Sequence, residues 1–295
     1  MFYLNGEFVR EEDAKISVLD LSVLRGFAVF DYLRTYRKKP FHLWEHLLRL
    51  AHSCEEVGLE IPKSLDEIAG IVEELLARSD FDEASLKIVV TGGISPDQFT
   101  PQVEGSNLIA FAYPLSHYPE EYYREGISVI TTRLSRSMPA SKTTQYTSAI
   151  VAIQKAKALK PKEALYVNAQ GEILEATTSN FFAFKEGVLY TCDSDEVLVG
   201  ITREVVLRVT EGLYRVERRP LKVEEISAME EAFITASNKE VIPVVQIDGQ
   251  PIGDGKVGPR TREIMRLFHC YTQEEEWPPL FISRYPDKIQ RVTHK

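Results

Sequence analysis

Lys142 is the residue whose place in the sequence most clearly suggests covalent chemistry. It stands near the start of ASKTTQYTSAIVAIQKAK, which begins at Ala140, where hydroxyl residues and Tyr146 precede an apolar, alanine-rich stretch. A surface helix distributes its lysines along its outer face, as Lys155 and Lys157 do here. A lysine at the head of such a stretch can instead attack a carbonyl compound and form a Schiff base. A solvated loop lysine is the ordinary alternative, so the rest of a site has to be found elsewhere in the chain.

Pyridoxal phosphate is the aldehyde that a Schiff-base lysine most commonly holds, and it makes three separate demands on a protein. Its phosphate group favours a helix N-terminus and an arginine. Its pyridine nitrogen needs a carboxylate, which keeps the ring protonated and able to accept electrons. Its phenolic oxygen needs a hydrogen-bond donor such as a tyrosine hydroxyl.

The segment GITREVVLRV is the candidate for the phosphate site. Gly200 is followed by Ile201 and Thr202 where a helix is expected to begin, so free backbone N–H groups and a hydroxyl can meet an anion there. Arg49, in HLLRL, lies in a predicted helix of the N-terminal half and can add a guanidinium group. The ordinary alternatives are a helix N-cap for Thr202 and a solvated helix residue for Arg49.

Glu175 and Tyr146 are the candidates for the two ends of the cofactor ring. Glu175 lies in GEILEATTSNFFAF, just before a predicted strand, and can serve the pyridine nitrogen. Tyr146 is expected one helical turn from Lys142 and can reach the phenolic oxygen. Taken singly, a turn carboxylate and a core aromatic residue are the alternatives for these two positions.

The whole chain has the composition of a globular protein. Its 295 residues are 44% hydrophobic and 10% aromatic, and a chain of this length commonly forms two domains. The net charge, 35 − 44 = −9, is spread without long blocks of one sign, which argues against nucleic acid as the main partner. We see no secretory signal and no membrane span. Three widely spaced cysteines without a CxxC pair argue against a disulfide framework or a zinc knuckle and fit a reducing cytoplasm.

Sequence patterns predict strands and helices throughout the N-terminal half. Asn5-Gly6 in YLNGEFV predicts a β-hairpin, and AVFDYLRTYRKKPFHL is interpreted as a strand, a basic turn and a returning segment. Apolar residues at helical spacing predict helices from Trp44 to Gly58 and from Leu65 to Ala77. LKIVVTGG and NLIAFAYPL predict two further strands.

The polar, proline-bearing segment SHYPEEYY is expected to connect two domains. We therefore expect an N-terminal α/β domain at 1–115, a connection at 116–124, and a C-terminal α/β domain at 125–295 that carries Lys142. In the second half, the patterns predict a strand at GISVITTRL, helices near 146–159, 203–213 and 258–269, and strands near 163–168, 180–192, 231–235 and 242–247. Strands joined by hairpins and interleaved with helices indicate an α+β or mixed α/β fold class. The tail from Gln273 onward has too many prolines for regular structure.

Two familiar patterns are rejected. HLWEH, from His42 to His46, matches the inverted zinc-protease pattern, but Pro40 places His42 at or before the start of the helix. We interpret it as part of an amphipathic helix with histidines on its exposed face, and we expect no metal. GDGKVG, from Gly253 to Gly258, matches G-x-G-x-x-G. No second strand with an acidic residue is expected after the following helix, so we interpret it as a tight surface connection.

In chain order, the candidate residues and their flanking segments resemble the class IV aminotransferases, the fold-type IV pyridoxal-phosphate enzymes. The resemblance runs to about Phe268, through YLNGEFV, RGFAVFD, HLLRLAHS, VTGG, KTTQY, GEILEATTSNFFAF, GITREVV, SNKEVIPVVQIDG and GDGKVG. This family includes D-amino-acid aminotransferase, branched-chain aminotransferase and aminodeoxychorismate lyase. The resemblance implies a two-domain fold of the D-amino-acid aminotransferase type, with pyridoxal phosphate bound between the domains.

The resemblance also implies a role for each candidate. Lys142 becomes the Schiff-base lysine and later the proton shuttle between the substrate and the cofactor. The implied cofactor-binding residues are Arg49, Ile201, Thr202 and Ser237 at the phosphate, Glu175 at the pyridine nitrogen and Tyr146 at the phenolic oxygen. The implied reaction consists of two half-reactions, in which an amino acid gives up its amino group and a 2-oxo acid then receives it.

The substrate pocket departs from the family pattern. In D-amino-acid aminotransferase the VT-G strand carries an arginine for the substrate α-carboxylate, and here that position is Gly92. The tyrosine of the GVYE motif is Phe30 here, with Asp31 in place of the glutamate. Arg25 stands where branched-chain enzymes place a tyrosine that reaches into the neighbouring subunit's site, so we expect it to supply the missing cation. A surface arginine in a loop is its alternative. Asn238 is a further substrate-binding candidate.

The sequence therefore predicts a pyridoxal-phosphate-dependent aminotransferase, with D-amino acids favoured because IDGQPIGDGKVGPRTREI and EGVLYTCDSDEVLVGITR look closest to that branch. Branched-chain L-amino-acid transfer is the second interpretation, and an aminodeoxychorismate lyase the third. A non-catalytic binding protein would be expected to have lost Lys142 or Glu175. We expect a cytoplasmic homodimer that acts on small molecules, without nucleic acid or membrane partners. Stereochemistry, the preferred oxo acid, assembly beyond a dimer and the role of the tail stay open.

Overall fold

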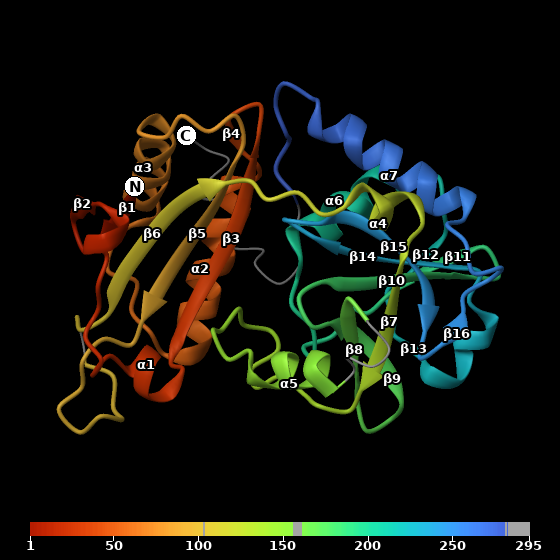
Figure 1. Cartoon of the computed structure of the whole chain (residues 1–295), viewed down its shortest axis with the longest axis horizontal. Coiled ribbons are helices and arrows are strands. Elements are labelled where there is room, and N and C mark those ends of the chain that lie inside the picture. The colour runs from red at the N-terminus through yellow and green to blue at the C-terminus, as the bar shows by residue number, and fades with distance from the viewer. Residues whose placement is uncertain (103, 156–160, 281, 283–295) are drawn as a thin grey trace. The chain divides into compact units, whose positions relative to one another are not determined.

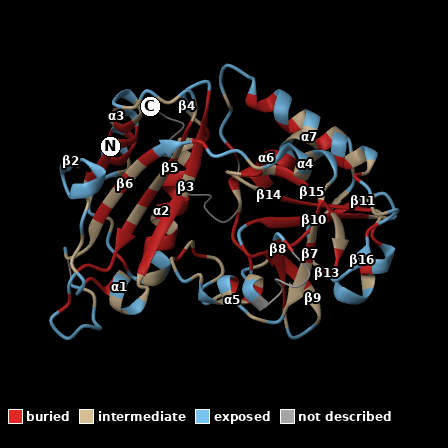
Figure 2. Cartoon of the chain, in the orientation of Figure 1, coloured by how far each residue is buried: buried red, intermediate tan, exposed pale blue. Residues whose placement is uncertain are grey.

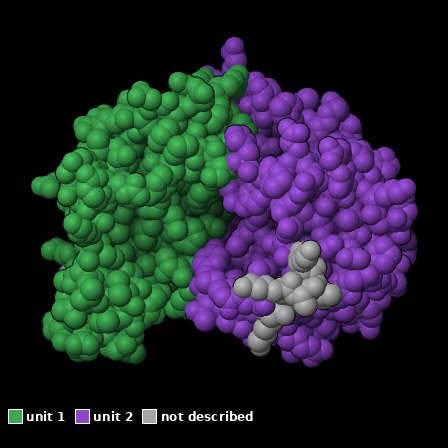
Figure 3. Space-filling model, viewed as in Figure 1, with its two compact units in different colours: residues 1–116, 141–145, 277–295 green, residues 117–140, 146–276 purple. Residues whose placement is uncertain are grey.

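The structure, a computed structural model, describes residues 1–102, 104–155, 161–280 and 282 of the 295-residue chain. Contacts divide the chain into two units, which Figure 3 shows in different colours. Unit 1 comprises residues 1–116, 141–145 and 277–295, and unit 2 comprises residues 117–140 and 146–276. The chain therefore returns to unit 1 twice after leaving it at residue 116, and each unit has its own β-sheet (Figure 1).

An antiparallel sheet of six strands, in the order β2-β1-β6-β5-β3-β4, forms the frame of unit 1. The strands are β1 (Phe2–Leu4), β2 (Glu7–Val9), β3 (Ala28–Tyr36), β4 (Lys39–Pro40), β5 (Ala84–Thr91) and β6 (Asn107–Pro114). The predicted Asn5-Gly6 hairpin is confirmed, with positive φ at both residues. Strand β3 is buried along nearly its whole length (Figure 2), whereas β5 alternates and presents Lys87 and Val89 on the face opposite the core.

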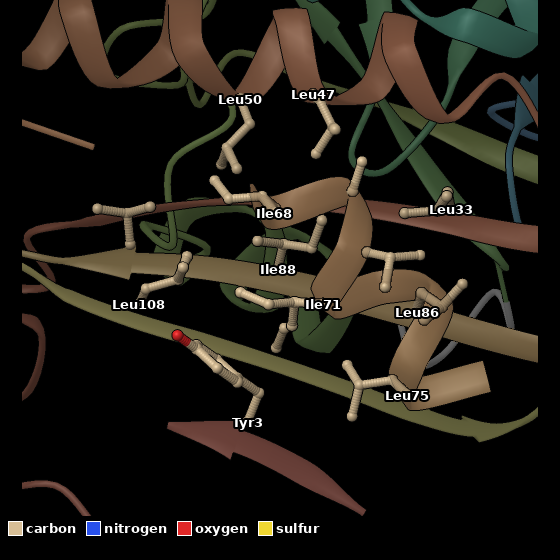
Figure 4. Packing of buried hydrophobic residues seen from close by; sticks show 14 of the residues in the cluster. Tyr3, Leu33, Leu47, Leu50, Ile68, Ile71, Leu75, Leu86, Ile88 and Leu108 are labelled. Carbon is tan, nitrogen blue, oxygen red and sulfur yellow. The ribbon is translucent and has the colours of Figure 1, made fainter. Parts of the chain in front are cut away.

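Two amphipathic helices pack on this sheet, α2 (Leu43–Val57) and α3 (Leu65–Ala77), and both confirm the predicted helices. Helix α2 ends at Gly58, which has a φ of 72°. Helix α3 begins with a capping box between Ser64 and Glu67. Their apolar faces meet the sheet in the core shown in Figure 4, which includes Tyr3, Leu33, Leu47, Leu50, Ile68, Ile71, Leu75, Leu86, Ile88 and Leu108. A short helix, α1 (Leu21–Arg25), precedes β3, and a 3₁₀ turn, η1, spans Glu11–Asp13.

Unit 2 is built on a mixed sheet of ten strands, in the order β12-β11-β10-β14-β15-β7-β8-β9-β13, with β16 added on β15. The strands are β7 (Ile127–Thr132), β8 (Glu163–Val167), β9 (Glu172–Ala176), β10 (Asn180–Lys185), β11 (Val188–Thr191), β12 (Val216–Glu217), β13 (Leu221–Lys222), β14 (Glu231–Ala236), β15 (Glu240–Ile247) and β16 (Gln250–Pro251). Strand β9 also pairs with β10 through Glu175 and Asn180. The strands from β10 through β14, β15, β7 and β8 to β9 therefore close into a ring.

The helices of unit 2 are α4 (Glu120–Arg124), α5 (Thr147–Lys155), α6 (Ile201–Val209) and α7 (Pro259–Thr272), with a 3₁₀ segment, η3 (Val223–Ala228). Helices α6 and α7 confirm the two later predictions with shifted bounds. Helix α5 begins near its predicted start, and residues 156–159 of that prediction lie outside the described residues. Helix α4 lies in the segment that we expected to be a plain connection. Together the two sheets and their helices confirm the mixed α/β fold class.

The segment that carries Lys142 packs with unit 1, although the expected bounds placed it with the C-terminal half. The backbone N–H of Phe30 donates to the Lys142 carbonyl at 2.9 Å, and the N–H of Thr144 donates to the Ala28 carbonyl at 3.0 Å. Thr143 also forms a β-bridge with Val29. These bonds extend the β3 edge of the sheet. The expectation of one helical turn between Lys142 and Tyr146 is wrong, because this segment is not helical and α5 begins only at Thr147.

The HLWEH segment is also different from its interpretation. His42 does precede α2, as predicted, but His42 and His46 are both buried rather than exposed. His42 Nδ1 lies 3.2 Å from Glu45 Oε1, and the same Glu45 oxygen accepts a 2.8 Å hydrogen bond from the backbone N–H of Leu280. The segment therefore holds part of the C-terminal tail. Among the described residues, no group of histidine, cysteine, aspartate and glutamate side chains is arranged to hold a metal ion.

The part of the chain that the structure describes contains no helix with both the length and the apolar character needed to cross a bilayer.

The residues GDGKVG, from Gly253 to Gly258, form the connection between β16 and α7 that the sequence predicted. Gly253 has a φ of 55°, and a Cβ there would lie 2.5 Å from the Glu230 carbonyl oxygen. Close backbone approach, rather than a ligand, accounts for this glycine.

Candidate active site

Lys142 is held at its backbone from two sides of unit 1. Its N–H donates to the Ser53 hydroxyl of α2 at 3.1 Å, and its carbonyl accepts from Phe30 of β3. Its side chain is half-buried, and Nζ lies 4.9 Å from the centre of the Phe30 ring. The ring face therefore supports the amine, as in cation–π contacts generally. Phe30, one of the predicted substrate-side residues, therefore lies beside Lys142.

Arg49 belongs to a buried cluster of three polar residues on α2 and β3. Its Nε lies 2.8 Å from Asp31 Oδ2, and its Nη2 lies 2.8 Å from Asp31 Oδ1. Asp31 Oδ1 also lies 2.6 Å from His46 Nδ1. All three side chains are at least 97% buried. Arg49 is thus an oriented, fully enclosed guanidinium, not the solvated helix residue of its alternative interpretation.

The charges of this cluster determine its protonation. Burial alone would raise the pKa of Asp31, but the charges and hydrogen bonds of Arg49 and His46 outweigh it and hold that pKa far below its usual value. Burial lowers the pKa of His46, against an upward contribution from Asp31. At neutral pH the cluster therefore contains an ionised Asp31, a charged Arg49 and a neutral His46.

A second amine, which the sequence interpretation missed, lies near the Phe30 ring that the Lys142 amine also approaches. Lys87 of β5 is directly opposite Tyr32 of β3, and its Nζ lies 4.5 Å from the centre of the same Phe30 ring. Burial lowers the pKa of Lys87. The signal was present in LKIVVTGG, where a lysine interrupts an apolar strand at the alternation expected for the non-core face.

Gly92, the position at which the carboxylate arginine was expected and is absent, is closely packed. A Cβ at Gly92 would lie 2.7 Å from Phe27 Cδ1 and 3.1 Å from Leu21 Cβ. A larger residue would require the Phe27 ring to shift, so the glycine is part of how this loop packs. Arg25, the expected replacement cation, is the last residue of α1 and is exposed, with one hydrogen bond of 3.2 Å to the Leu24 carbonyl.

Glu175 lies on β9 in unit 2 and is 3% exposed. Its Oε1 lies 2.5 Å from Arg136 Nη1, and its Oε2 accepts from the Leu198 N–H at 3.1 Å and from Asn180 Nδ2 at 3.4 Å. Burial lowers the pKa of Arg136, but the charges of Glu175 and Tyr146 raise it by more, so the net change is upward. Arg136 thus favours the ionised carboxylate. The sequence interpretation did not identify Arg136, since an arginine in an irregular loop gives no pattern.

The start of α6 has the form expected of an anion site. Gly200 is the N-cap and has no side chain to satisfy the N–H groups of Ile201 and Thr202. A Cβ on Gly200 would lie 1.9 Å from Asn180 Oδ1, so the close approach of Asn180 requires glycine. Asn180 therefore touches both Glu175 and the helix start, and these two sequence-predicted features are brought together in unit 2.

Ser237 and Asn238 lie in the turn between β14 and β15. The turn follows Thr235, which pairs with Asn180 across the sheet. Asn238 Nδ2 donates to the Tyr118 hydroxyl at 2.9 Å. Tyr146 directly precedes α5, and its carbonyl accepts the first helical hydrogen bond from Ile150. The candidates therefore form two groups. Lys142, Phe30, Arg49 and Arg25 belong to unit 1; Tyr146, Glu175, Ile201, Thr202, Ser237 and Asn238 belong to unit 2.

Comparison with known proteins identifies the family. The model of the family "Amino-transferase class IV" matches residues 28–247, which include every candidate residue except Arg25. The chain belongs to the class IV aminotransferases. The resemblance expected from the sequence is thereby confirmed, and so are the enzyme class and its family cofactor, pyridoxal phosphate.

The relatives of this class IV aminotransferase carry two different names. The chain is 34% identical to the "Putative branched-chain-amino-acid aminotransferase" of Methanocaldococcus jannaschii, over 90% of this chain and 94% of the relative. It is 32% identical to the D-alanine aminotransferase of Staphylococcus epidermidis, over 92% and 97%. The solved structure of the branched-chain aminotransferase from Thermoproteus uzoniensis with norvaline has a TM-score of 0.84 and 30% identity, over 95% and 97%. The comparisons therefore support aminotransfer without choosing between the two substrate classes.

Proposed function

We propose that this chain transfers amino groups between an amino acid and a 2-oxo acid, with pyridoxal phosphate held on Lys142. The observation that carries the proposal is the way Lys142 is fixed: Ser53 and Phe30 bind its backbone, and the Phe30 ring supports its amine. Because its backbone and its side chain are both supported, the amine of Lys142 is held in one place, as a Schiff-base residue requires.

The residues present fit pyridoxal phosphate. The uncapped N–H groups of Ile201 and Thr202 suit a phosphate, with Arg49 and Ser237 as the proposed additional donors. Glu175, kept ionised by Arg136, is the proposed partner of the pyridine N–H, and Tyr146 of the phenolic oxygen. When bound, the cofactor withdraws electrons from the substrate Cα. Lys142 would then take the Cα proton and return it to the cofactor's C4′ carbon, and Glu175 would hold the proton on the ring nitrogen.

The substrate carboxylate requires a cation, and the proposed source is Arg25 of a second subunit. A homodimer is proposed because exposed apolar residues gather around α1 and the loop that bridges to it, namely Val18, Leu19, Val23, Ile94 and Phe99. A second copy would cover this surface and use the adjacent Arg25. Lys87 is proposed as a cation from the same subunit, since it shares the Phe30 ring with Lys142. Phe30 and Asn238 are proposed to line the pocket.

D-amino acids are the substrate class that we propose first. Support comes from the D-alanine aminotransferase relatives and from the segments that precede α6 and follow β15 in the sequence. Branched-chain L-amino acids are the second candidate, favoured by the 34% identical relative and by the solved structures. A cytoplasmic location is proposed because Cys54, Cys192 and Cys270 are all free thiols, which fits a reducing compartment.

The test of the proposed reaction compares Lys142→Ala with Lys87→Met, which removes the neighbouring amine. The wild type and Lys87→Met should be yellow and should retain the cofactor covalently after borohydride reduction, whereas Lys142→Ala should do neither. A reducible chromophore in Lys142→Ala would assign the cofactor to another lysine. Substrate class is then decided by half-reactions of the wild type with single D- and L-amino acids, followed by the cofactor absorbance, with 2-oxoglutarate or pyruvate in the return step. Conversion by neither series would favour the lyase.

A further inference from the structure

A buried ion pair in unit 2, between Lys239 and Glu163, consists of two residues that have no role in the proposed site. Lys239 is 6% exposed and Glu163 is 2% exposed. Lys239 Nζ donates to Glu163 Oε1 and to the Thr178 hydroxyl, and it lies 3.1 Å from the Ser179 hydroxyl. The ammonium group therefore has three oxygen acceptors and no need of a ligand.

The carboxylate of Glu163 organises the loop between β9 and β10. It accepts hydrogen bonds from the Thr177 hydroxyl, from the Thr178 hydroxyl at 2.5 Å, from the Thr178 N–H at 3.2 Å and from the Ser179 hydroxyl at 3.2 Å. This loop begins directly after the strand that carries Glu175 and ends at Asn180, whose amide contacts Glu175. Its conformation therefore sets the position of the proposed pyridine partner.

Lys239 in turn fixes the turn that carries Ser237. The Lys239 N–H donates to the Ala236 carbonyl at 3.0 Å, which closes the turn between β14 and β15. The Lys239 carbonyl accepts from the Tyr123 hydroxyl at 3.1 Å. With its side chain anchored on Glu163, Lys239 is tied at three points, and it lies two residues after Ser237.

Stability alone is a poor account of such a pair. Two charges removed from water lose hydration, and apolar residues of similar size often stabilise a fold equally well or better. Burial alone would raise the pKa of Glu163, but the charge of Lys239 and the loop hydroxyls outweigh it and lower that pKa, so the carboxylate is ionised at neutral pH. What the pair provides is geometry: one ammonium and one carboxylate bind two loops to each other.

We propose that Lys239 and Glu163 are positioning residues that hold the Ser237–Asn238 turn and the 177–179 loop in register for the cofactor. The proposal deepens the proposed function and rests on it, because Ser237 and Glu175 are the cofactor contacts that the pair would align. Neither Lys239 nor Glu163 touches substrate or cofactor in this account.

The test uses the full-length enzyme and four variants. Lys239→Met removes the charge and keeps most of the stem, and the double variant Glu163→Gln/Lys239→Met also removes the unpaired buried carboxylate. Lys239→Arg is the conservative substitution. The matched control is Glu225→Gln/Lys185→Met, which removes a second ion pair of unit 2, 2.7 Å long, between β10 and η3. Affinities for pyridoxal phosphate and for pyridoxal, which lacks the phosphate, are measured on cofactor-free enzyme, together with thermal midpoints and amide hydrogen exchange.

The expected result separates positioning from stability. Lys239→Met should weaken pyridoxal phosphate about tenfold or more, the change expected from one lost phosphate hydrogen bond. It should change pyridoxal affinity less, and it should speed exchange in 177–180 and 236–240. The double variant should regain the thermal midpoint without regaining affinity, while Lys239→Arg and the control pair should bind as the wild type does.

Affinity that recovers together with the thermal midpoint in the double variant would overturn the proposal, and so would unchanged exchange in both loops. If Lys239→Met does not fold, the double variant decides by the same criteria. Failure of the wild type to bind pyridoxal phosphate would refute the proposed function instead. The exchange measurement needs no cofactor, so it still decides whether the pair holds the two loops.

Discussion

Asp31→Asn is the change that best tests the account of Arg49. The substitution keeps the size of the side chain and removes a charge that two Arg49 nitrogens contact at 2.8 Å. Arg49 would remain almost fully buried without its carboxylate. Removing one partner of a buried pair costs about 3–5 kcal/mol. With a urea m-value of about 2 kcal/mol per molar for this unit, the midpoint should fall by about 1.5–2.5 M.

The dependence on pH has a definite sign. The pKa of Asp31 is lowered in the folded chain, so its contribution is present above the unfolded value of about 3.9 and is lost as the pH falls below it. The difference in the free energy of unfolding between wild type and Asp31→Asn should therefore be constant above about pH 5. It should narrow by about 0.7 kcal/mol at about pH 3.5, because the unfolded carboxyl is then largely protonated while the folded one is not.

The assay is selective because both tryptophans of the chain, Trp44 and Trp277, belong to unit 1. Urea unfolding followed by tryptophan fluorescence thus reports the unit that contains Asp31. Asp31→Glu keeps the charge and is the control, with a loss well below that of Asp31→Asn. A midpoint for Asp31→Asn close to the wild-type value, or a gap that does not change with pH, would refute the argument that this carboxylate stabilises a buried Arg49.

Three further predictions concern turnover and KM. Glu175→Gln should bind the cofactor but lose about a hundredfold or more in turnover, roughly 3 kcal/mol, since an amide cannot hold the pyridine proton; near-normal rates would exclude the role. Arg25→Ala should raise KM for amino and oxo acids alike, and mixing it with Lys142→Ala subunits should restore activity, unless Arg25 serves its own subunit. Lys87→Met should raise KM about tenfold. Because burial lowers the pKa of Lys87, wild-type KM should rise at alkaline pH as the ammonium is lost, and Lys87→Arg should abolish that rise.

The regular elements of this fold could be predicted because local rules decide them. Helix α3 has its capping box at Ser64 and Glu67, α2 ends at Gly58 with positive φ, and the Asn5-Gly6 hairpin needs no distant contact. The 141–145 segment could not be predicted in the same way. Its backbone is held by hydrogen bonds to Ala28 and Phe30, more than a hundred residues earlier, so it is not helical, and the helix begins only at Thr147.

The residues of the candidate site likewise differ in whether the sequence alone could predict them. A lysine, a glutamate before a strand and a glycine before a helix are visible in the sequence because their types and spacing carry chemical meaning. Residues that act through those groups are not visible. Asp31 and His46 enclose Arg49, and Arg136 holds Glu175, but each is an ordinary polar residue until the fold places it beside its partner.

Gly92, at the position expected to carry the carboxylate arginine, packs against residues close to Arg25 in the sequence. A Cβ at Gly92 would lie 2.7 Å from the Phe27 ring and 3.1 Å from Leu21 Cβ, so a larger residue there requires the Phe27 side chain to shift, next to the helix that ends in Arg25. Lys87 adds a cation close to the Phe30 ring, which the Lys142 amine also approaches. Under the proposed function, Arg25 and Lys87 both serve the substrate carboxylate, and the two substitutions should be non-additive if both contact one carboxylate.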